Sequence, residues 1–316
     1  MNKLISIVIP VYNEEENIHN AYTVVTSIMN ELNGKYDYEI IFTDNHSNDR
    51  SFEILSTIAK QDSKVRIIRF SNNFGYQRSI LTGYNFSKGN AAIQLDCDLQ
   101  DPPELIPEFI KHWERGYNVV YGVRKSRQEK TLLNIFRKLF YRVINLVSED
   151  FLPEDAGDFR LIDRNVLNVL KKFKSSRPYL RGAIASIGFN QIGIEYDRRK
   201  RRKGVSKFSI SNLIGLGLDG ISSHSVLPLR IATYFGLMVS CFTFILTCIY
   251  LVGKLFLYKT WPAGFTTIIL LILSVLGIIP LMLGIIGEYI GRIVSEVTDR
   301  PSVIIEKTIN SSERMN

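Results

Sequence analysis

The sequence predicts an α/β protein with a mainly parallel sheet, followed by two transmembrane helices. Three observations support this prediction. Short runs rich in Val and Ile alternate five times with segments of helical periodicity between residues 4 and 124. Polar clusters follow these runs. They stand at the carboxyl ends of the expected strands, which is where ligands bind in open parallel sheets. Two long stretches without any charged residue begin at Ile231 and Gly264.

Each expected strand is a short run of β-branched residues that stops at a turn signal, and each expected helix has apolar residues at helical spacing. The expected strands are 4–11, 38–44, 65–70, 91–96, 118–124 and 159–163, with one more in 300–309 that docks on the soluble domain. The expected helices are 13–32, 52–60, 75–89, 102–116 and 132–147. Alternation of this kind predicts helices on both faces of the sheet.

The stretches Ile231–Gly253 and Gly264–Gly287 each exceed the roughly 20 apolar residues that cross a bilayer core. The N-terminal segment has no small-residue cleavage site, so we expect no signal peptide. The expected organisation is an α/β domain over 1–208, interface helices over 209–230, transmembrane helices over 231–257 and 264–290, and a C-terminal tail over 291–316.

The net charge of +8 is concentrated in the basic run Arg198–Lys203 and Lys207, shortly before the first apolar stretch. A basic cluster beside a membrane segment favours anionic lipid head groups over nucleic acid as its partner. Positive charge stays on the cytoplasmic side. We therefore expect a multi-pass protein of the inner (plasma) membrane whose α/β domain, over 1–208, and tail face the cytoplasm.

The segment AAIQLDCDLQDPPE carries the strongest chemical signal. Asp96 and Asp98 stand one residue apart at the end of an apolar strand, and Gln100 and Asp101 follow at once. Mg²⁺ and Mn²⁺ take oxygen ligands from one or two carboxylates and leave room for substrate phosphates. A nucleotide-diphosphate sugar needs such an ion, because its leaving group gains negative charge as the glycosidic bond breaks.

With these motifs the chain resembles the family-2 glycosyltransferases of GT-A fold, specifically the polyprenyl-phosphate glycosyltransferases. It resembles the bacterial two-span enzymes that glucosylate undecaprenyl phosphate, and also dolichyl-phosphate mannose synthase. The matching motifs, in chain order, are IVIPVYNEEENI, TDNHSND, NFGYQ, LDCDLQDPP, GDFRLIDR and RRKRRKGVSKF. The resemblance covers nearly the whole chain and implies a membrane-anchored transferase.

The resemblance also implies a role for each matching position. The nucleotide sugar would be bound by Pro10, Tyr12, Glu14, Asp44 and Asp96, with Asp44 near the base. The metal would be bound by Asp96, Asp98 and Gln100, and catalysis would involve Asp96 and Asp158. The lipid phosphate would be bound by Arg198, Arg201, Ser206 and Lys207. Similar proteins form tetramers, so the resemblance leaves a homo-oligomer open.

The sequence departs from the family pattern at Asn45 and His46, where Asp and Gly are common, and at Phe208, where Tyr is common. These departures concern base and ribose contacts. Glucose from a UDP-sugar is the donor that the resemblance favours.

A lipid phosphate is largely ionised near neutral pH, since its second pKa is near 6, so its oxygen needs little help from a base. Direct displacement by this oxygen predicts inversion, from an α-linked donor to a β-linked product. Asp158 would then orient a substrate or act as a base. The alternatives are a polysaccharide synthase, for which two spans make a poor pore, and a non-catalytic membrane scaffold.

Overall fold

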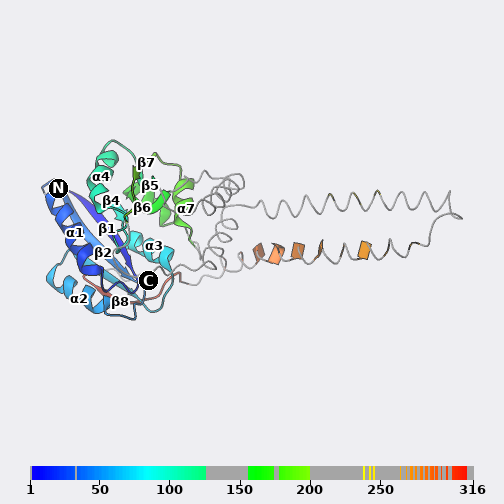
Figure 1. Cartoon of the computed structure of the whole chain (residues 1–316), viewed down its shortest axis with the longest axis horizontal. Coiled ribbons are helices and arrows are strands. Elements are labelled where there is room, and N and C mark those ends of the chain that lie inside the picture. Colours follow the sequence, from blue (N-terminus) through cyan, green and yellow to red (C-terminus); the bar gives the residue numbers. More distant parts are fainter. Residues whose placement is uncertain are drawn as a thin grey trace. The chain divides into compact units, whose positions relative to one another are not determined.

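The computed structural model describes residues 2–32, 34–125, 156–173, 178–199 and 301–311, together with single residues between 238 and 297 (Figure 1). The contacts divide the chain into two compact units, and the sheet lies in the unit that contains both the N-terminal part and residues 301–311. The expected helix over 132–147 and the interface segment over 209–230 lie outside the described residues.

Within the described residues, eight strands form one sheet in the order β7-β5-β6-β4-β1-β2-β3-β8. The strands are β1 (Lys3–Val11), β2 (Tyr36–Asp44), β3 (Val65–Phe70), β4 (Ala91–Gln94), β5 (Val119–Arg124), β6 (Ala156–Asp163), β7 (Gln191–Tyr196) and β8 (Ile305–Ile309). The pairs β1–β2, β2–β3, β1–β4 and β5–β7 are parallel, whereas β6 and β8 run antiparallel to their neighbours. The predicted mainly parallel sheet is therefore confirmed.

Helices cover both faces of this sheet, because alternate strand residues point to opposite sides. Ile7 and Ile9 of β1 belong to one apolar cluster, whereas Val8 belongs to another. The helices of the first cluster are α1 (Ile18–Glu31), α2 (Ser51–Gln61) and α4 (Ile106–Glu114), with the 3₁₀ turn η1 (Pro103–Leu105) before α4. Those of the second are α3 (Tyr76–Phe86), α6 (Arg164–Leu170) and α7 (Leu180–Ser186).

The first helix begins later than its periodicity predicts. We expect it from residue 13, but α1 begins at Ile18, and Asn13 has a positive φ of 53°. The reason is tertiary. The Asn13 and Glu14 backbone N–H groups donate to Ser47 Oγ and Ser51 Oγ at 2.9 Å each, so this segment forms a loop held to the loop after β2 and to the first residue of α2.

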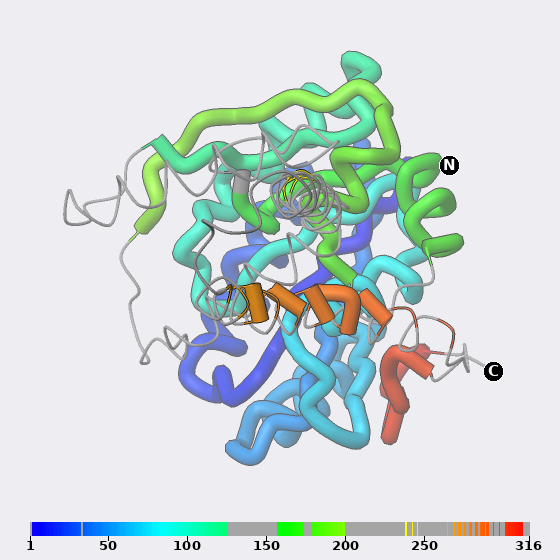
Figure 2. Tube along the Cα trace, turned by 90° about the vertical axis from the view of Figure 1, so that its right-hand side faces the viewer, coloured from blue at the N-terminus to red at the C-terminus, as the bar shows by residue number. Residues whose placement is uncertain are grey.

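The strand expected after the apolar stretches is present. β8 pairs antiparallel with β3 and forms one edge of the sheet; it is the red segment in Figure 2. The prediction that residues 300–309 contain a strand docked on the soluble domain is confirmed. The sheet therefore includes chain from both sides of the two apolar stretches.

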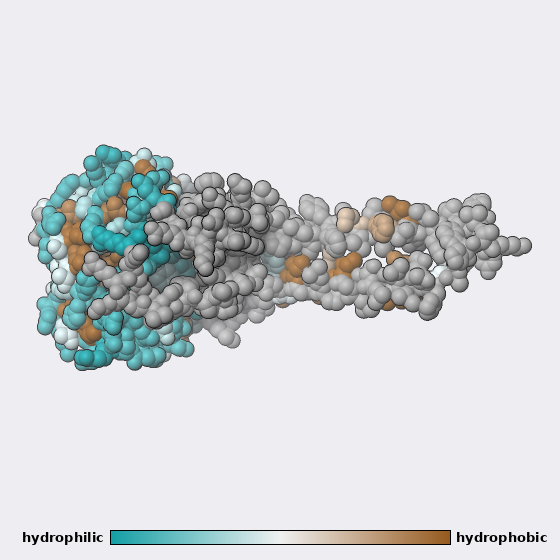
Figure 3. Space-filling model, in the orientation of Figure 1, coloured by the Kyte–Doolittle hydropathy of each residue, from teal (hydrophilic) through white to brown (hydrophobic). Residues whose placement is uncertain are grey.

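Hydrophilic residues cover most of the coloured surface of the sheet-bearing unit in the view of Figure 3. The described residues between 238 and 297 differ, because large apolar side chains there are exposed (brown in Figure 3). They are Met238, Phe242, Ile245, Ile268, Ile272, Val275, Ile279, Leu283, Ile286, Ile290, Ile293 and Val297. Within the residues that the structure describes, no helix combines the length and the apolar character needed to cross a membrane.

Candidate active site

The sequence-predicted site residues that the structure describes lie at the carboxyl ends of neighbouring parallel strands. Parallel pairing places the carboxyl ends of β1, β2 and β4 together. β6 runs antiparallel to β4, with Gln94 opposite Arg160, so Asp158 near the start of β6 comes to the same edge. β5 and β7 end there as well, with Arg124 opposite Tyr196. The fold thus gathers segments that are more than 150 residues apart in the chain.

The loops after β1 and β2 support each other. Pro10 is buried in β1, while Tyr12 and Glu14 in the following loop are partly exposed. In addition to the two serine hydrogen bonds described above, the Asn48 backbone N–H donates to Asn13 Oδ1 at 2.8 Å. Because each loop satisfies polar groups of the other, the residues expected to contact a nucleoside are held in one arrangement.

Asp44 ends β2 as a fully buried carboxylate. Its Oδ1 accepts a hydrogen bond from the Ser47 backbone N–H at 3.1 Å. Its Oδ2 has no hydrogen-bond donor in the described part of the chain and lies 3.7 Å from the Arg69 guanidinium. Burial raises the pKa of Asp44, and the Ser47 hydrogen bond and Arg69 oppose that rise. A buried acceptor without a donor is costly, which suits a ligand N–H at this position.

The acidic loop begins directly after β4. Tyr76 Oη donates to Asp96 Oδ1 at 2.5 Å, and Gln94 Nε2 donates to the same oxygen at 2.8 Å. Asp98 Oδ1 accepts from the Gln100 backbone N–H at 3.2 Å. Asp96, Asp98 and Gln100 are all partly exposed, so their oxygens remain reachable by a ligand.

The donor chemistry of this loop fits a divalent cation. Burial raises the pKa of Asp96 to about 7, and the negative charges of Asp101, Asp98 and Asp158 contribute to the rise. The loop thus holds an excess of negative charge that a cation would offset. No group of three or more His, Cys, Asp or Glu that could hold a metal occurs among the described residues. Two carboxylates, one amide and substrate phosphates are nevertheless a usual Mg²⁺ environment.

Asp101 joins the acidic loop to the start of the basic run. Its side chain is 2% exposed and accepts a hydrogen bond from Tyr196 Oη at 2.5 Å. Arg124 NH2 lies 3.2 Å from Asp101 Oδ2, and Arg198 Nε lies 3.4 Å from Oδ1. The Arg199 backbone N–H also donates to the Gln100 carbonyl at 2.9 Å. The first residues of the basic run are therefore fixed against the loop that carries Asp98.

Of the residues expected to bind the lipid phosphate, only Arg198 is described by the structure. Arg201, Ser206 and Lys207 lie outside the described residues. The Arg198 side chain is 31% exposed, so one guanidinium contacts Asp101 while retaining access to solvent. This contact therefore joins the acidic loop, in which metal ligands are predicted, to one residue predicted to bind the lipid phosphate.

Asp158 forms an ion pair with both ends of the Arg181 guanidinium. Arg181 Nε donates to Oδ1 at 2.9 Å, and NH2 donates to Oδ2 at 2.7 Å. Burial alone would raise the pKa of Asp158, but Arg181, Arg160 and Gln77 overcome it and lower the pKa to about 2. A carboxylate with so low a pKa is a weak proton acceptor. Of the two roles expected for Asp158, this environment favours orientation of a substrate.

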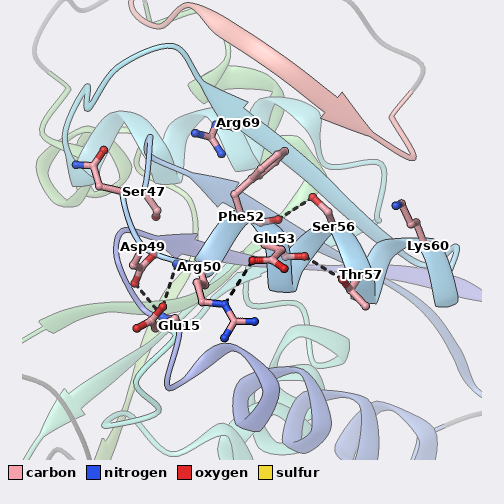
Figure 4. Close-up of a pocket in the computed structure, with 11 residues that line it drawn as sticks. Glu15, Ser47, Asp49, Arg50, Phe52, Glu53, Ser56, Thr57, Lys60 and Arg69 are labelled. Carbon is pink, nitrogen blue, oxygen red and sulfur yellow. Dashed lines mark hydrogen bonds and ion pairs between the residues drawn. The ribbon is translucent and has the colours of Figure 1, made fainter.

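A groove with a volume of about 1110 Å³ opens beside the loop after β2 (Figure 4). It is lined by residues of that loop and of α2, with Glu15 and Arg69 at its sides. Arg69 stacks on the Phe52 ring, 4.2 Å from its centroid. Asp96, Asp98 and Asp158 are not among the lining residues. The groove therefore flanks the Asp44 side of the site and does not hold the acidic loop.

Sequence reasoning assigned no role to several residues that complete the site. Arg181, Arg124, Tyr196 and Tyr76 hold the carboxylates of Asp158, Asp101 and Asp96. Tyr76 lies in the NFGYQ motif and Asp101 in the acidic motif, so these two had a local signal. Arg181, Arg124 and Tyr196 had none, because their partners lie 23 to 95 residues away.

A mainly parallel sheet with an acidic D-x-D loop after β4 and a buried Asp at the end of β2 defines a nucleotide-sugar transferase domain of GT-A type. The family described as "Glycosyl transferase family 2" matches residues 6–170. The chain belongs to this family of glycosyltransferases.

The chain is similar to several relatives over almost their full length, among them the three that follow. The chain is 42% identical to the uncharacterized glycosyltransferase YkcC of Bacillus subtilis, covering 96% of this chain and 93% of that protein. It is 36% identical to the uncharacterized glycosyltransferase sll0501 of Synechocystis, covering 95% and 94%. It is 35% identical to the bactoprenol glucosyl transferase of Shigella phage SfII, covering 96% and 98%. The similarity thus extends well beyond the residues matched by the family.

Proposed function

We propose that the chain transfers glucose from a UDP-sugar to undecaprenyl phosphate, with inversion at the anomeric carbon, at the cytoplasmic face of the plasma membrane. The single observation that carries this proposal is the contact between Asp101 and Arg198, which joins the acidic loop to the basic run. The name of the Shigella phage relative supports both the sugar and the polyprenyl acceptor. The product is a β-linked lipid phosphate sugar for modification of cell-envelope glycans.

The donor binds across the ends of β1, β2 and β4. Asp44 Oδ2, which lacks a hydrogen-bond donor in the described structure, accepts from an N–H of the nucleobase. Pro10 at the end of β1, with Tyr12 and Glu14 in the following loop, holds the nucleoside from the β1 side. Asp96, Asp98 and Gln100 would hold Mg²⁺ or Mn²⁺, which when bound stabilises the negative charge on the departing diphosphate.

The acceptor phosphate approaches from the basic run. An arginine guanidinium can donate two hydrogen bonds to phosphate oxygens, and a lysine ammonium adds a compact positive charge. The lipid head group would therefore be held by Arg198, Arg201, Ser206 and Lys207. A phosphate oxygen forms the new bond to the anomeric carbon as the bond to the nucleoside diphosphate breaks, and the diphosphate keeps the electron pair. Because the phosphate is already ionised, no proton needs to be removed. Asp158, held ionised by Arg181, orients the sugar.

The two apolar stretches anchor the enzyme as transmembrane helices. The exposed apolar side chains among the described residues between 238 and 297 support this part of the proposal, since a surface of this kind avoids water. The basic run before the first stretch supports the cytoplasmic placement. Interface helices over 209–230 would bring the lipid head group to the site, and anionic lipids would be the remaining membrane partners.

The proposal is tested with the full chain in detergent, radiolabelled nucleotide sugars, undecaprenyl phosphate and Mg²⁺ or Mn²⁺. We expect label in the organic phase with UDP-glucose, and a product carrying one sugar. Asp98→Asn should abolish transfer while the thermal unfolding temperature stays unchanged, because the side chain is partly exposed.

Glu104→Gln is the matched control, since Glu104 lies in the same segment and pairs with Arg199 in an exposed ion pair. It should retain transfer, because exposed ion pairs contribute little. Label that stays in water with every donor would contradict the proposal, and a chain of several sugars would favour a polysaccharide synthase instead. Full activity of Asp98→Asn would refute the metal assignment.

A further inference from the structure

The edge strand β8 is fixed tightly beside the nucleotide loop. It pairs with β3 so that Lys307 stands opposite Arg69 and Ile305 opposite Phe70. Beyond its end, Asn310 Nδ2 donates to the Ala59 carbonyl at 2.6 Å and to the Val65 carbonyl at 2.9 Å. Before its start, the Ser71 backbone N–H donates to the Ile304 carbonyl at 2.9 Å. Both ends of the strand are therefore anchored to the α2–β3 region.

Glu306 is the residue that the pairing leaves out. The register shifts between Arg69 and Phe70, so Lys307 and Ile305 have partners and Glu306 has none in the ladder. An irregularity of this kind redirects a side chain and is common beside active sites. The Glu306 carboxylate accepts a hydrogen bond from Arg69 Nε at 3.0 Å and lies 3.7 Å from His46 Nδ1.

The two residues that contact Glu306, Arg69 and His46, are both close to Asp44, in space and in the sequence respectively. Arg69 lies between two carboxylates, because its Nε binds Glu306 while its NH1 lies 3.7 Å from the buried Asp44 Oδ2. Stacking on Phe52 fixes the plane of the guanidinium (Figure 4). His46 follows Asp44 by two residues, has a positive φ of 60°, and places Nδ1 3.1 Å from the Phe70 carbonyl oxygen.

We propose that Glu306 is a positioning residue for the nucleotide donor: it holds Arg69 toward Asp44 and His46 against β3, and thereby fixes the loop that binds the base. This inference rests on the proposed function, in which Asp44 accepts a hydrogen bond from the nucleobase. It also gives a role to His46, since a glycine, which is common at this position in the family pattern, would offer no group to Glu306. The strand that follows the apolar stretches thus contributes to donor binding.

The test is Glu306→Gln in the full chain, with UDP binding measured by calorimetry and initial rates measured against each substrate. The amide keeps the shape but removes the charge that aligns Arg69. For a half-exposed ion pair we expect UDP affinity to fall about three- to fivefold, and the donor KM to rise equally. The kcat and the acceptor KM should stay unchanged. The ratio of variant to wild-type affinity should approach one in 1 M salt, because salt screens exposed ion pairs.

Two control variants separate positioning from general effects. Glu53→Gln removes an exposed carboxylate that pairs with Arg50 on the same groove, and it should bind UDP like the wild type. Asn310→Ala loosens the anchor of β8 without removing the charge of Glu306. It should lower the unfolding temperature, whereas Glu306→Gln should leave that temperature unchanged. If Glu306 only held the fold together, both variants would lower the unfolding temperature. A lower unfolding temperature in Asn310→Ala alone therefore separates a positioning role from a structural one.

Equal UDP affinity of Glu306→Gln and wild type in low salt would overturn the inference while leaving the proposed function intact. An equal rise of both KM values, or a loss of affinity that persists in 1 M salt, would also overturn it. Absence of UDP binding by the wild-type protein would refute the proposed function itself. The two failures are therefore distinguishable in one set of measurements.

Discussion

Replacing Asp101 by Asn should separate the acidic loop from the basic run. The asparagine keeps an oxygen that can accept the Tyr196 hydrogen bond, but it removes the charge that neutralises Arg124 and Arg198. The Arg124 side chain is only 12% exposed, so its guanidinium would be left almost buried without a counter-charge. The change therefore tests the contact on which the proposed function depends most.

The magnitude follows from burial. Breaking a buried ion pair by removing one partner costs about 3–5 kcal/mol. Because the partly exposed guanidinium of Arg198 can be hydrated instead, we take the lower end of this range. The expected cost of losing the native arrangement of the acidic loop and Arg198 is thus about 3 kcal/mol. Since 1.36 kcal/mol corresponds to a tenfold change in rate, this predicts a fall of about a hundredfold in kcat/KM for the lipid acceptor.

The assay measures initial transfer rates at saturating donor while undecaprenyl phosphate is varied, together with the unfolding temperature of each variant. Lys125→Gln is a neighbouring control outside the basic run, because Lys125 pairs with Glu195 at an exposed position and should leave kcat/KM within about twofold of wild type. A kcat/KM of Asp101→Asn within threefold of wild type would refute the reasoning.

Two further predictions concern the other buried carboxylates. The pKa of Asp158 is about 2 against an ordinary value of 3.8, so its ion pair with Arg181 stabilises the fold fully above pH 4, and that stability is lost as the pH falls through 2. Between pH 5 and pH 2 the wild type should lose about 2 kcal/mol of unfolding free energy more than Asp158→Asn, and parallel pH curves of the two would contradict this origin. Asp44→Asn places an amide near Oδ2 and should weaken UDP binding about tenfold or more without changing the acceptor KM. An unchanged dissociation constant for UDP would remove Asp44 from the nucleotide site.

Much of this site was predictable because its chemistry is carried by local motifs at strand ends. Asp44, Asp96 and Asp98 each follow an apolar β-branched run, and parallel strands gather their carboxyl ends at one edge. The start of α1 was not predictable in the same way. Its periodicity runs back to residue 13, but hydrogen bonds from Asn13 and Glu14 to Ser47 and Ser51, which follow β2, prevent the helix from starting there.

The sequence by itself determined the α/β alternation, the acidic D-x-D loop, the basic run and the two apolar stretches. Each of these features depends only on the spacing, polarity and charge of residues that are neighbours in the chain. Only the tertiary structure decided which partners these features meet. The order β7-β5-β6-β4-β1-β2-β3-β8 brings Arg198 to Asp101, Arg181 to Asp158 and Glu306 to Arg69. The physical reason is that periodicity reports which face of a segment is buried, whereas pairing between distant segments depends on packing of the whole sheet.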